Sequence, residues 1–359
     1  MKNHVILFAI LLVFSCFSAQ GAMRVLFVNP STAGDPFWHK VETFSVQAAG
    51  DLEINLDIVY GDGHREFQHR AIARYLATHP APDYAVLINY PGGNGQSMQL
   101  LEQHGVYFVT LEETLSQQER ELVRKPGERF HYWLAELSHD NQHAGQQLAS
   151  FLHEKAVGQG IESPLVAAIG GHYGGETNLR VNGLRDFLAD HPGQLVQVVH
   201  GRWQQEIARQ QTAKLLQRYP ELSIIWCASD AMAMAAAQQA QQHGKVVNKD
   251  MFIGGFDWLA DSLSAIGDGR QTASVGGHFL MGAWALVKAY DHRFSVSKSS
   301  TQEVRFKLAI AHQGNVKRIL PLVDPNNWQQ IDFKSYTRTH NSTLDEYPFD
   351  VQSILNQHF

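Results

Sequence analysis

The sequence predicts an α/β protein with two doubly wound parallel sheets. Short apolar, β-branched runs alternate with amphipathic segments of helix length along most of the chain, which is typical of βαβ units. About ten runs have the character of strands, too many for one small sheet. They fit two sheets of about five strands each, with a break near residues 136–140, and 359 residues are enough for two domains.

The elements follow in order. The expected strands are Arg24–Asn29, Asn55–Tyr60, Tyr84–Asn89, Tyr107–Leu111, Tyr132–Leu137, Leu165–Gly170, Leu195–His200, Ile224–Ala228, Phe252–Phe256 and Ala273–Gly276. The expected helices are Trp38–Asp51, Glu66–Thr78, Gly95–His104, Asn141–Glu154, Asn178–Asp190, Ile207–Tyr219, Ala231–His243 and Leu280–His292. Val304–His312 alternates like one more strand, and from Ile319 onward we expect irregular structure on the surface.

The first 22 residues have the features of a cleaved signal peptide. Lys2 supplies a positive start, Val5–Phe14 an apolar stretch and Ala19–Gly21 a small-residue cleavage site. The apolar stretch is shorter than the roughly 20 residues of a membrane-spanning helix. We therefore expect a periplasmic or secreted protein. Lipid attachment at Cys16 stays open as an alternative, although Val13–Ser15 makes a poor lipobox.

Charge and cysteine content narrow the classes of partner. The formal net charge is −6 and basic residues form no blocks, which argues against nucleic acid or an anionic membrane surface as partner. Once the leader is removed, Cys227 is the remaining cysteine, so an intramolecular disulfide is impossible. Its apolar neighbours indicate a buried, unreactive thiol.

The end of the first strand carries the clearest candidate site. Asp35 suits a helix N-cap and Pro36 the first helical turn, which places Phe37 and Trp38 at the carboxyl end of Arg24–Asn29. Ligands of open α/β sheets bind at this edge. We therefore expect the two aromatic rings to face a ligand.

Other strand ends bring polar and aromatic residues to the same edges of the sheets. They are Glu112, Glu113, Arg180, Trp203, Ser229, Asp230, Phe256, Asp257 and His278. Several of them have a structural alternative: the glutamates as solvated surface acids, Arg180 in a surface ion pair, and Trp203 in a core. Ser229 and Asp230 also suit an N-cap and a first helical turn.

The sequence has no positive signal for catalysis, a cofactor or a metal. The glycines of residues 90–95 match neither a Walker loop nor a dinucleotide fingerprint. His139 and His143 have the spacing of helical metal ligands but lack an acidic third ligand, and Asp140 between them suits an N-cap. No nucleophile elbow or zinc-protease motif occurs. We therefore expect no enzyme activity and no cofactor.

Taken together, six segments resemble the type I periplasmic binding proteins, above all the ribose-binding branch and the periplasmic autoinducer-2 receptor. They are DPFW at 35–38, DYAVLINY at 83–90, FVTLEE at 108–113, HDNQHAGQQLASFL at 139–152, ASDAMAMAA at 228–236 and IGGFDWLADSLSAIGDG at 253–269. The resemblance runs from about residue 24 to 312 and implies two Rossmann-like domains joined by three crossings, near 135–139, 276–280 and 309–313. It implies an N-terminal lobe of 23–136 with 279–310, a C-terminal lobe of 137–278 with 311–345, and a tail of 346–359.

The resemblance also implies a ligand-binding set. In the family, the loop after the first strand supplies a polar residue and two stacking aromatic rings, which correspond here to Asp35, Phe37 and Trp38. An Asp-Arg pair of the family corresponds to Glu112 and Glu113. The remaining positions fall near Asn178, with Arg180 two residues on, and on Trp203, Ser229, Asp230, Asp257 and Gly277 or His278. The family's arginine at the second position of the pair is missing here.

This lining favours a neutral, polyhydroxylated ligand such as a sugar, or a cationic one, over a borate diester or another anion. The implied function is a solute-binding protein that closes on its ligand and presents the closed form to an ABC permease or to a membrane sensor of the histidine kinase or diguanylate cyclase type. An amine-binding accessory protein of a sensor is the alternative, and an exported enzyme is a different class. A LacI-type repressor would carry a basic helix-turn-helix where the leader stands.

Overall fold

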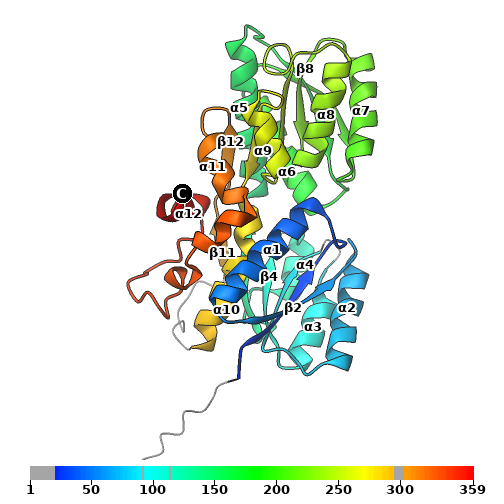
Figure 1. Cartoon of the computed structure of the whole chain (residues 1–359). Coiled ribbons are helices and arrows are strands. Elements are labelled where there is room, and N and C mark those ends of the chain that lie inside the picture. The colour runs from blue at the N-terminus through cyan, green and yellow to red at the C-terminus, as the bar shows by residue number, and fades with distance from the viewer. Residues whose placement is uncertain (1–20, 91–92, 113–114, 295–302) are drawn as a thin grey trace, which may run out of the picture.

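A computed structural model describes residues 21–90, 93–112, 115–294 and 303–359 of the chain (Figure 1). In this part, twelve strands form two six-stranded sheets with the orders β11-β5-β4-β3-β1-β2 and β12-β10-β9-β8-β6-β7. Both sheets are parallel except that β12 runs antiparallel to β10. The doubly wound α/β architecture expected from the sequence is confirmed. Most of the expected leader, Cys16 included, and Glu113 lie outside the described residues.

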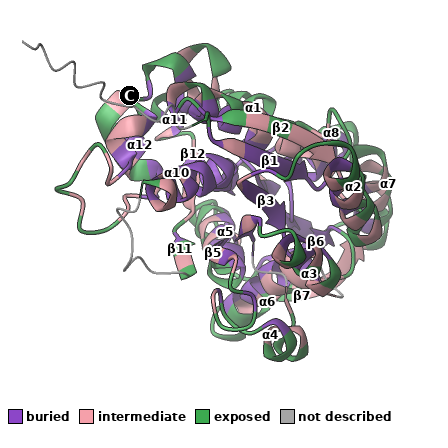
Figure 2. Ribbon diagram, turned by 90° about the horizontal axis from the view of Figure 1, so that it is seen from below, coloured by how far each residue is buried: buried purple, intermediate pink, exposed green. Residues whose placement is uncertain are grey.

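The first lobe is built on the first sheet. Its elements are β1 Arg24–Asn29, α1 Pro36–Asp51, β2 Asn55–Tyr60, α2 Arg65–Thr78, β3 Tyr84–Ile88, α3 Gly95–Gln103, β4 Tyr107–Leu111, α4 Gln117–Val123, β5 Trp133–His139, α10 Met281–Arg293 and β11 Glu303–Phe306. The buried faces of α1 and α10 pack on one side of this sheet, and residues of α2, α3 and the segment around Phe130 pack on the other. Figure 2 shows β1 and β3 buried between these layers.

The second lobe is built on the second sheet. Its elements are α5 Asn141–Gly158, β6 Leu165–Gly170, α6 Gly175–Ala189, β7 Gln194–His200, α7 Gln205–Arg218, β8 Leu222–Cys227, α8 Asp230–Gln242, β9 Phe252–Phe256, α9 Ala260–Gly267, β10 Ala273–Gly276 and β12 Ala309–His312. Figure 1 shows the two lobes stacked one above the other.

Val304–His312, expected as a single strand, is two short strands in the structure. β11 extends the first sheet and β12 the second, so the segment between Phe306 and Ala309 crosses from one lobe to the other. Two further crossings lie between β5 and α5 and between β10 and α10, where a 3₁₀ turn covers His278–Leu280. Each sheet gains one strand from this segment and therefore has six strands instead of the expected five.

Two glycines bring helices α5 and α6 of the second lobe into direct backbone contact. A Cβ on Gly145 would lie 1.9 Å from the carbonyl oxygen of Arg180, and a Cβ on Gly183 would lie 1.9 Å from that of Gln142. Real Cβ atoms do not approach so closely, so glycine is required at both positions. This contact fixes the position of Arg180 relative to the start of α5.

The C-terminal segment is more regular than expected. It forms α11 Val316–Val323, two 3₁₀ turns at Pro325–Gln330 and Phe333–Tyr336, and α12 Val351–His358. Trp328 and Phe333 pack edge-on against Phe44 of α1, with ring centroids 5.0 and 5.4 Å apart. Figure 1 shows this segment along one side of the molecule, beside the junction of the lobes. Its pattern was missed because α11 and α12 have eight residues each and a Pro-Asn-Asn run at 325–327 separates them.

Among the described residues, none of the helices combines the length and the apolar character needed to cross a bilayer. In the same residues, no group of three or more histidine, cysteine, aspartate and glutamate side chains is arranged to hold a metal ion.

Candidate functional site

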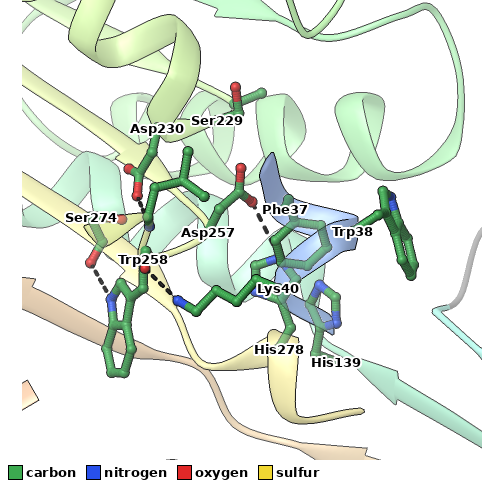
Figure 3. Close-up of polar contacts among 12 residues, drawn as sticks. Phe37, Trp38, Lys40, His139, Ser229, Asp230, Asp257, Trp258, Ser274 and His278 are labelled. Atoms are coloured by element: carbon green, nitrogen blue, oxygen red, sulfur yellow. Dashed lines mark hydrogen bonds and ion pairs between the residues drawn. The ribbon is translucent and has the colours of Figure 1, made fainter. Parts of the chain in front are cut away.

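A buried pair, Asp257 and His278, lies where the two lobes meet (Figure 3). Asp257 follows β9 and His278 follows β10, and Nε2 of His278 lies 3.3 Å from Oδ1 of Asp257. Burial lowers the pKa of His278 well below its usual value, so the imidazole is neutral. Burial also raises the pKa of Asp257 to about 7, against the opposing effect of the Arg180 charge. The two side chains therefore make a close polar contact in which the imidazole carries no charge.

The turn that carries Asp257 is held by contacts within the second lobe. Asp257 and Trp258 have positive φ angles of 105° and 55°, an unusual backbone conformation for residues with a Cβ. Oδ2 of Asp230 accepts the backbone N–H of Leu259 at 3.0 Å, and the Trp258 indole donates to the Ser274 carbonyl at 3.0 Å. The protein thus holds Asp257 in a strained position, a common feature of functional sites.

Ser229 and Asp230 lie behind this turn rather than at its surface. The Ser229 hydroxyl caps α8 by accepting the backbone N–H of Met232 at 3.4 Å. Asp230 is fully buried, and its contacts with Leu259 and Gln271 are internal. Burial and, to a smaller extent, the nearby charge of Asp257 raise the pKa of Asp230 to about 8. In this structure Asp230 holds the turn that carries Asp257, and Ser229 is the N-cap of α8.

The first lobe contributes two aromatic rings. The Phe37 ring lies 4.5 Å from the His278 ring and 5.3 Å from that of Trp38, which meets it edge-on. Oδ1 of Asp35 accepts the backbone N–H groups of Phe37 and Trp38 at 3.1 and 2.9 Å, so Asp35 is the N-cap of α1. The cap fixes the first helical turn and with it the direction of both rings.

Arg180 is buried in the second lobe and reaches the junction from α6. Its Nε donates to Oδ1 of Asn141 at 2.8 Å and its Nη1 to the Ala228 carbonyl at 2.9 Å. The guanidinium lies 4.6 Å from the centre of the Phe256 ring. Phe256 is itself fully buried, and its ring packs against the guanidinium. Asn178, by contrast, is exposed on the same helix.

Glu112 directly follows β4 of the first lobe. It is 6% exposed and has a positive φ of 59°. Burial, together with the smaller effect of the Glu176 charge, raises the pKa of Glu112 to about 8, against the opposing effect of Arg180. Carboxylates and a guanidinium from both lobes therefore act on one another electrostatically across the junction.

Trp203 lies in the loop between β7 and α7 of the second lobe. Its φ is 62°, and a Cβ on Gly171 would come within 2.0 Å of its indole ring. The half-buried indole therefore lies flat on the backbone at Gly171.

The structure adds Lys40, His139 and Asn141 to the residues expected at the junction. The Lys40 ammonium donates to the Trp258 carbonyl at 2.6 Å and lies 3.9 Å from the centre of the Phe279 ring. Burial lowers the pKa of Lys40 to about 7, although Asp230 and Asp257 act against this change. Lys40 is one helical turn after Phe37 on α1. This spacing places both side chains on the same face of the helix, and it was the sequence signal that could have identified Lys40 as a site residue.

His139 and Asn141 occupy the first crossing between the lobes. The His139 ring lies 4.9 Å from that of His278, and its Nε2 lies 3.1 Å from Oδ1 of Asn141. Burial lowers the pKa of His139 well below its usual value, so this imidazole is also neutral. Asp140 caps α5 as expected, accepting the backbone N–H of His143 at 2.8 Å.

Several buried polar atoms at the junction have no hydrogen-bond partner in the described part of the chain. They are Nδ1 of His139, Nδ1 of His278, Nδ2 of Asn141 and Oε2 of Glu176. Buried polar atoms in native proteins are normally paired, so these four atoms are candidates for contact with a polar ligand. Together with the Phe37 and Trp38 rings, they form a surface with both apolar faces and hydrogen-bonding groups.

Comparisons with known proteins agree with this geometry. A model of the periplasmic binding protein domain matches residues 25–293. The D-allose-binding periplasmic protein of Escherichia coli (strain K12) is 26% identical over 277 residues, which cover 75% of this chain and 83% of the relative. The crystal structure of a periplasmic sugar-binding protein from Pseudomonas fluorescens matches with a TM-score of 0.82 and 26% identity, over 93% of this chain and 100% of that chain.

A further solved structure supports the fold. It is an ABC transporter periplasmic solute-binding protein from Actinobacillus succinogenes 130z with bound D-allose, and it matches with a TM-score of 0.70 and 18% identity, over 82% of this chain and 99% of that chain. The family model covers well over half of the sequence, and the two lobes have the architecture that the resemblance implied. The chain belongs to the type I periplasmic binding protein family.

Proposed function

We propose that this protein is a periplasmic solute-binding protein that closes on a small polyhydroxylated molecule, a sugar or a close analogue. The observation that carries the proposal is the meeting of Phe37 from one lobe with the Asp257–His278 pair at the junction. The relatives named for D-allose and for sugars support the same ligand class.

The chemistry of the junction suits a sugar. An aromatic ring covers the apolar C–H face of a pyranose or furanose, while carboxylates and imidazoles exchange hydrogen bonds with the hydroxyls. Trp38 and Phe37 provide the rings, and Asp257, His278 and Arg180 the polar groups. The unpaired Nδ1 atoms of two neutral histidines can each donate to or accept from a hydroxyl, depending on the tautomer.

Binding and closure are linked in this proposal because the site residues lie on the crossings themselves. His139 ends β5 at the first crossing, and His278 begins the turn of the second. A ligand that contacts both changes the relative free energies of the open and closed arrangements. The hinge motion therefore needs no separate trigger.

The closed form would then be read by a membrane partner. An inner-membrane ABC permease is one candidate, and a membrane sensor of the kinase or cyclase type is the other. A strain that lacks the chain distinguishes them: loss of uptake of the labelled ligand supports the permease, and normal uptake with a lost transcriptional or cyclic-nucleotide response supports the sensor. In both cases the ligand leaves the protein chemically unchanged, and turnover would contradict the proposal.

Thermal unfolding with a panel of neutral aldohexoses and aldopentoses tests the site. We expect at least one sugar to raise the melting temperature of the wild type, and Trp38→Ala and Asp257→Ala to abolish that rise while still folding. Phe67→Ala and Asp261→Ala are matched controls, since both residues are exposed and outside the site. A normal rise in both site variants would remove Trp38 and Asp257 from the ligand contacts.

A further inference from the structure

The second crossing between the lobes contains two adjacent glycines, Gly276 at the end of β10 and Gly277 directly before His278. A Cβ on Gly276 would lie 2.4 Å from Cγ of the Trp258 indole, which belongs to the second lobe. A Cβ on Gly277 would lie 2.1 Å from Cγ2 of Val351, the first residue of α12. Glycines leave a chain free to rotate, but here side chains from two other elements fill the space beside both of them.

The contact of Val351 with the crossing is a direct one. Apart from the two chain neighbours of Gly277, Val351 alone among the described residues has atoms within 4 Å of that Cβ position. Gly277 has a φ of 110°, in the region that favours glycine, and Val351 is buried against it. A change of the Gly277 backbone therefore has to displace the Val351 side chain. Because interiors are closely packed, this side chain limits the movement of the chain directly before His278.

The start of α12 is fixed to the first lobe. Phe349, two residues before Val351, stacks on Trp284 of α10, with ring centroids 4.8 Å apart and planes inclined by 13°. The Tyr347 hydroxyl donates to Oδ2 of Asp291, also on α10, at 2.9 Å. Val351 is thus held on the crossing by an aromatic stack and a hydrogen bond to one helix of the first lobe.

The same C-terminal segment is joined to the second lobe through α11. This helix follows β12 after a short turn, and a Cβ on Gly267 of α9 would meet Cγ1 of Val316 at 3.7 Å. Arg318 of α11 donates to Oδ1 of Asn356 on α12. One apolar cluster includes buried residues of α9, α10, α11 and α12. The segment therefore connects both lobes and touches the crossing between them.

A hinge motion turns the lobes about their crossings, so the backbone at Gly276 and Gly277 has to change conformation. We propose that α12 is a brace of the hinge and that Val351 is a positioning residue, which holds Gly277 and through it His278. This inference rests on the proposed function, in which His278 contacts the ligand. Loss of the contact releases the crossing, so the ligand-free lobes adopt a wider range of separations and a smaller fraction of the protein is ready to bind.

Distance measurements by electron paramagnetic resonance test the brace in the ligand-free, full-length protein. Spin labels on Val46→Cys of α1 and Gln241→Cys of α8 report the separation of the lobes, since both positions are exposed and Cys227 is buried. We expect Val351→Ala to broaden the distribution of distances. Val351→Ile keeps both Cγ atoms and should retain the wild-type distribution.

Ile354→Val is the matched control. Ile354 is buried in the same helix, and removing one methylene group there weakens the packing of α12 without changing the contact with Gly277. This variant should retain the wild-type distribution. Gly277→Ala tests the contact from the other side, because its methyl group would meet Val351. It should also broaden the distribution, and its effect should be smaller when Val351→Ala is present.

Calorimetric titration with D-allose, D-glucose and D-galactose then measures the effect on binding. For a sugar that the wild type binds, we expect Val351→Ala to lose about five- to tenfold in affinity and Ile354→Val to bind normally. Unchanged distances in Val351→Ala and Gly277→Ala, equal broadening in Ile354→Val, or an unchanged affinity of Val351→Ala would overturn the inference. If the distances change as expected but the wild type binds no sugar of the panel above, the proposed function fails and the brace is supported.

Discussion

The ammonium nitrogen of Lys40 on α1 lies 2.6 Å from the carbonyl oxygen of Trp258, 218 residues later in the chain. The first residue belongs to the first lobe and the second to the turn that positions Asp257 in the second. This hydrogen bond therefore ties the arrangement of the lobes to the conformation of a proposed ligand-binding residue. The two are coupled in this arrangement of the lobes.

Replacing Lys40 tests this coupling. Lys40→Met keeps the apolar stem on the Phe279 ring and removes the donor to Trp258. A hydrogen bond from a charged group contributes about 1.5–3 kcal/mol, so we expect ligand affinity to fall by roughly 10- to 100-fold. His39→Met, on the same helix turn and exposed, should bind normally in the same calorimetric titration. Equal affinities of the two variants would show that the bond does not favour closure.

The buried carboxyls make the stability of the ligand-free protein depend on pH. The pKa of Glu112 is 4.5 in an unperturbed side chain and about 8 in the folded protein, so between these values the folded state holds a proton that the unfolded state has lost. The free energy of unfolding therefore decreases as pH rises through this window. Asp257 and Asp230 act in the same direction. The pKa of Asp257 rises from 3.8 to about 7 on folding, and that of Asp230 from 3.8 to about 8.

Glu112→Gln isolates this effect. The variant cannot lose the proton, so its free energy of unfolding should exceed that of the wild type by about 1–3 kcal/mol at pH 8 and differ little at pH 4.5. Urea titrations at the two pH values measure the difference, with Asp261→Asn as the exposed control. Equal stabilities of variant and wild type at pH 8 would contradict the burial of a carboxyl with a raised pKa.

The close contact between α5 and α6 predicts a strong effect of one methyl group. In Gly183→Ala the new Cβ would meet the Gln142 carbonyl oxygen at 1.9 Å, so the helices must separate and Arg180 must move. We expect a loss of about 2 kcal/mol or more in stability, together with weaker ligand binding. Gly158→Ala at the end of α5, where a Cβ meets nothing within 4 Å, should be neutral or slightly stabilising.

Cys227 tests whether the core of the second lobe is closed to solvent. The thiol is fully buried in β8, and burial raises its pKa far above the usual range. We expect no reaction of the native protein with Ellman's reagent over hours and complete reaction in urea, because the thiolate is the reactive form. Rapid labelling of the native protein would indicate local opening of the second sheet.

The sequence predicted the sheets well because their strands are short and apolar. Six of the ten expected strands, among them Arg24–Asn29 and Phe252–Phe256, have the same bounds in the structure. Such runs are encoded locally, so a single sequence reveals them. The division of Val304–His312 between two sheets was not predicted, because it depends on where the lobes lie and not on the pattern of side chains.

The candidate site was predictable in part. Strand ends in βα units meet at one edge, which is why Phe37, Asp257 and His278 could be expected together. Lys40 was missed because its partner is a backbone carbonyl 218 residues away, and a carbonyl has no sequence signal. Asp230 was expected to face the ligand, whereas its oxygens contact Leu259 and Gln271 behind the turn.

The central claim is that residues of both lobes enclose one small hydroxylated ligand. Native mass spectrometry of the protein purified from periplasm, then mixed with a pooled set of neutral and amino sugars, tests it most directly. We predict a complex with one such molecule per chain for the wild type, and no complex for Trp38→Ala or Asp257→Ala. A complex that persists in both variants, or a wild type that binds none of these molecules, would contradict the claim.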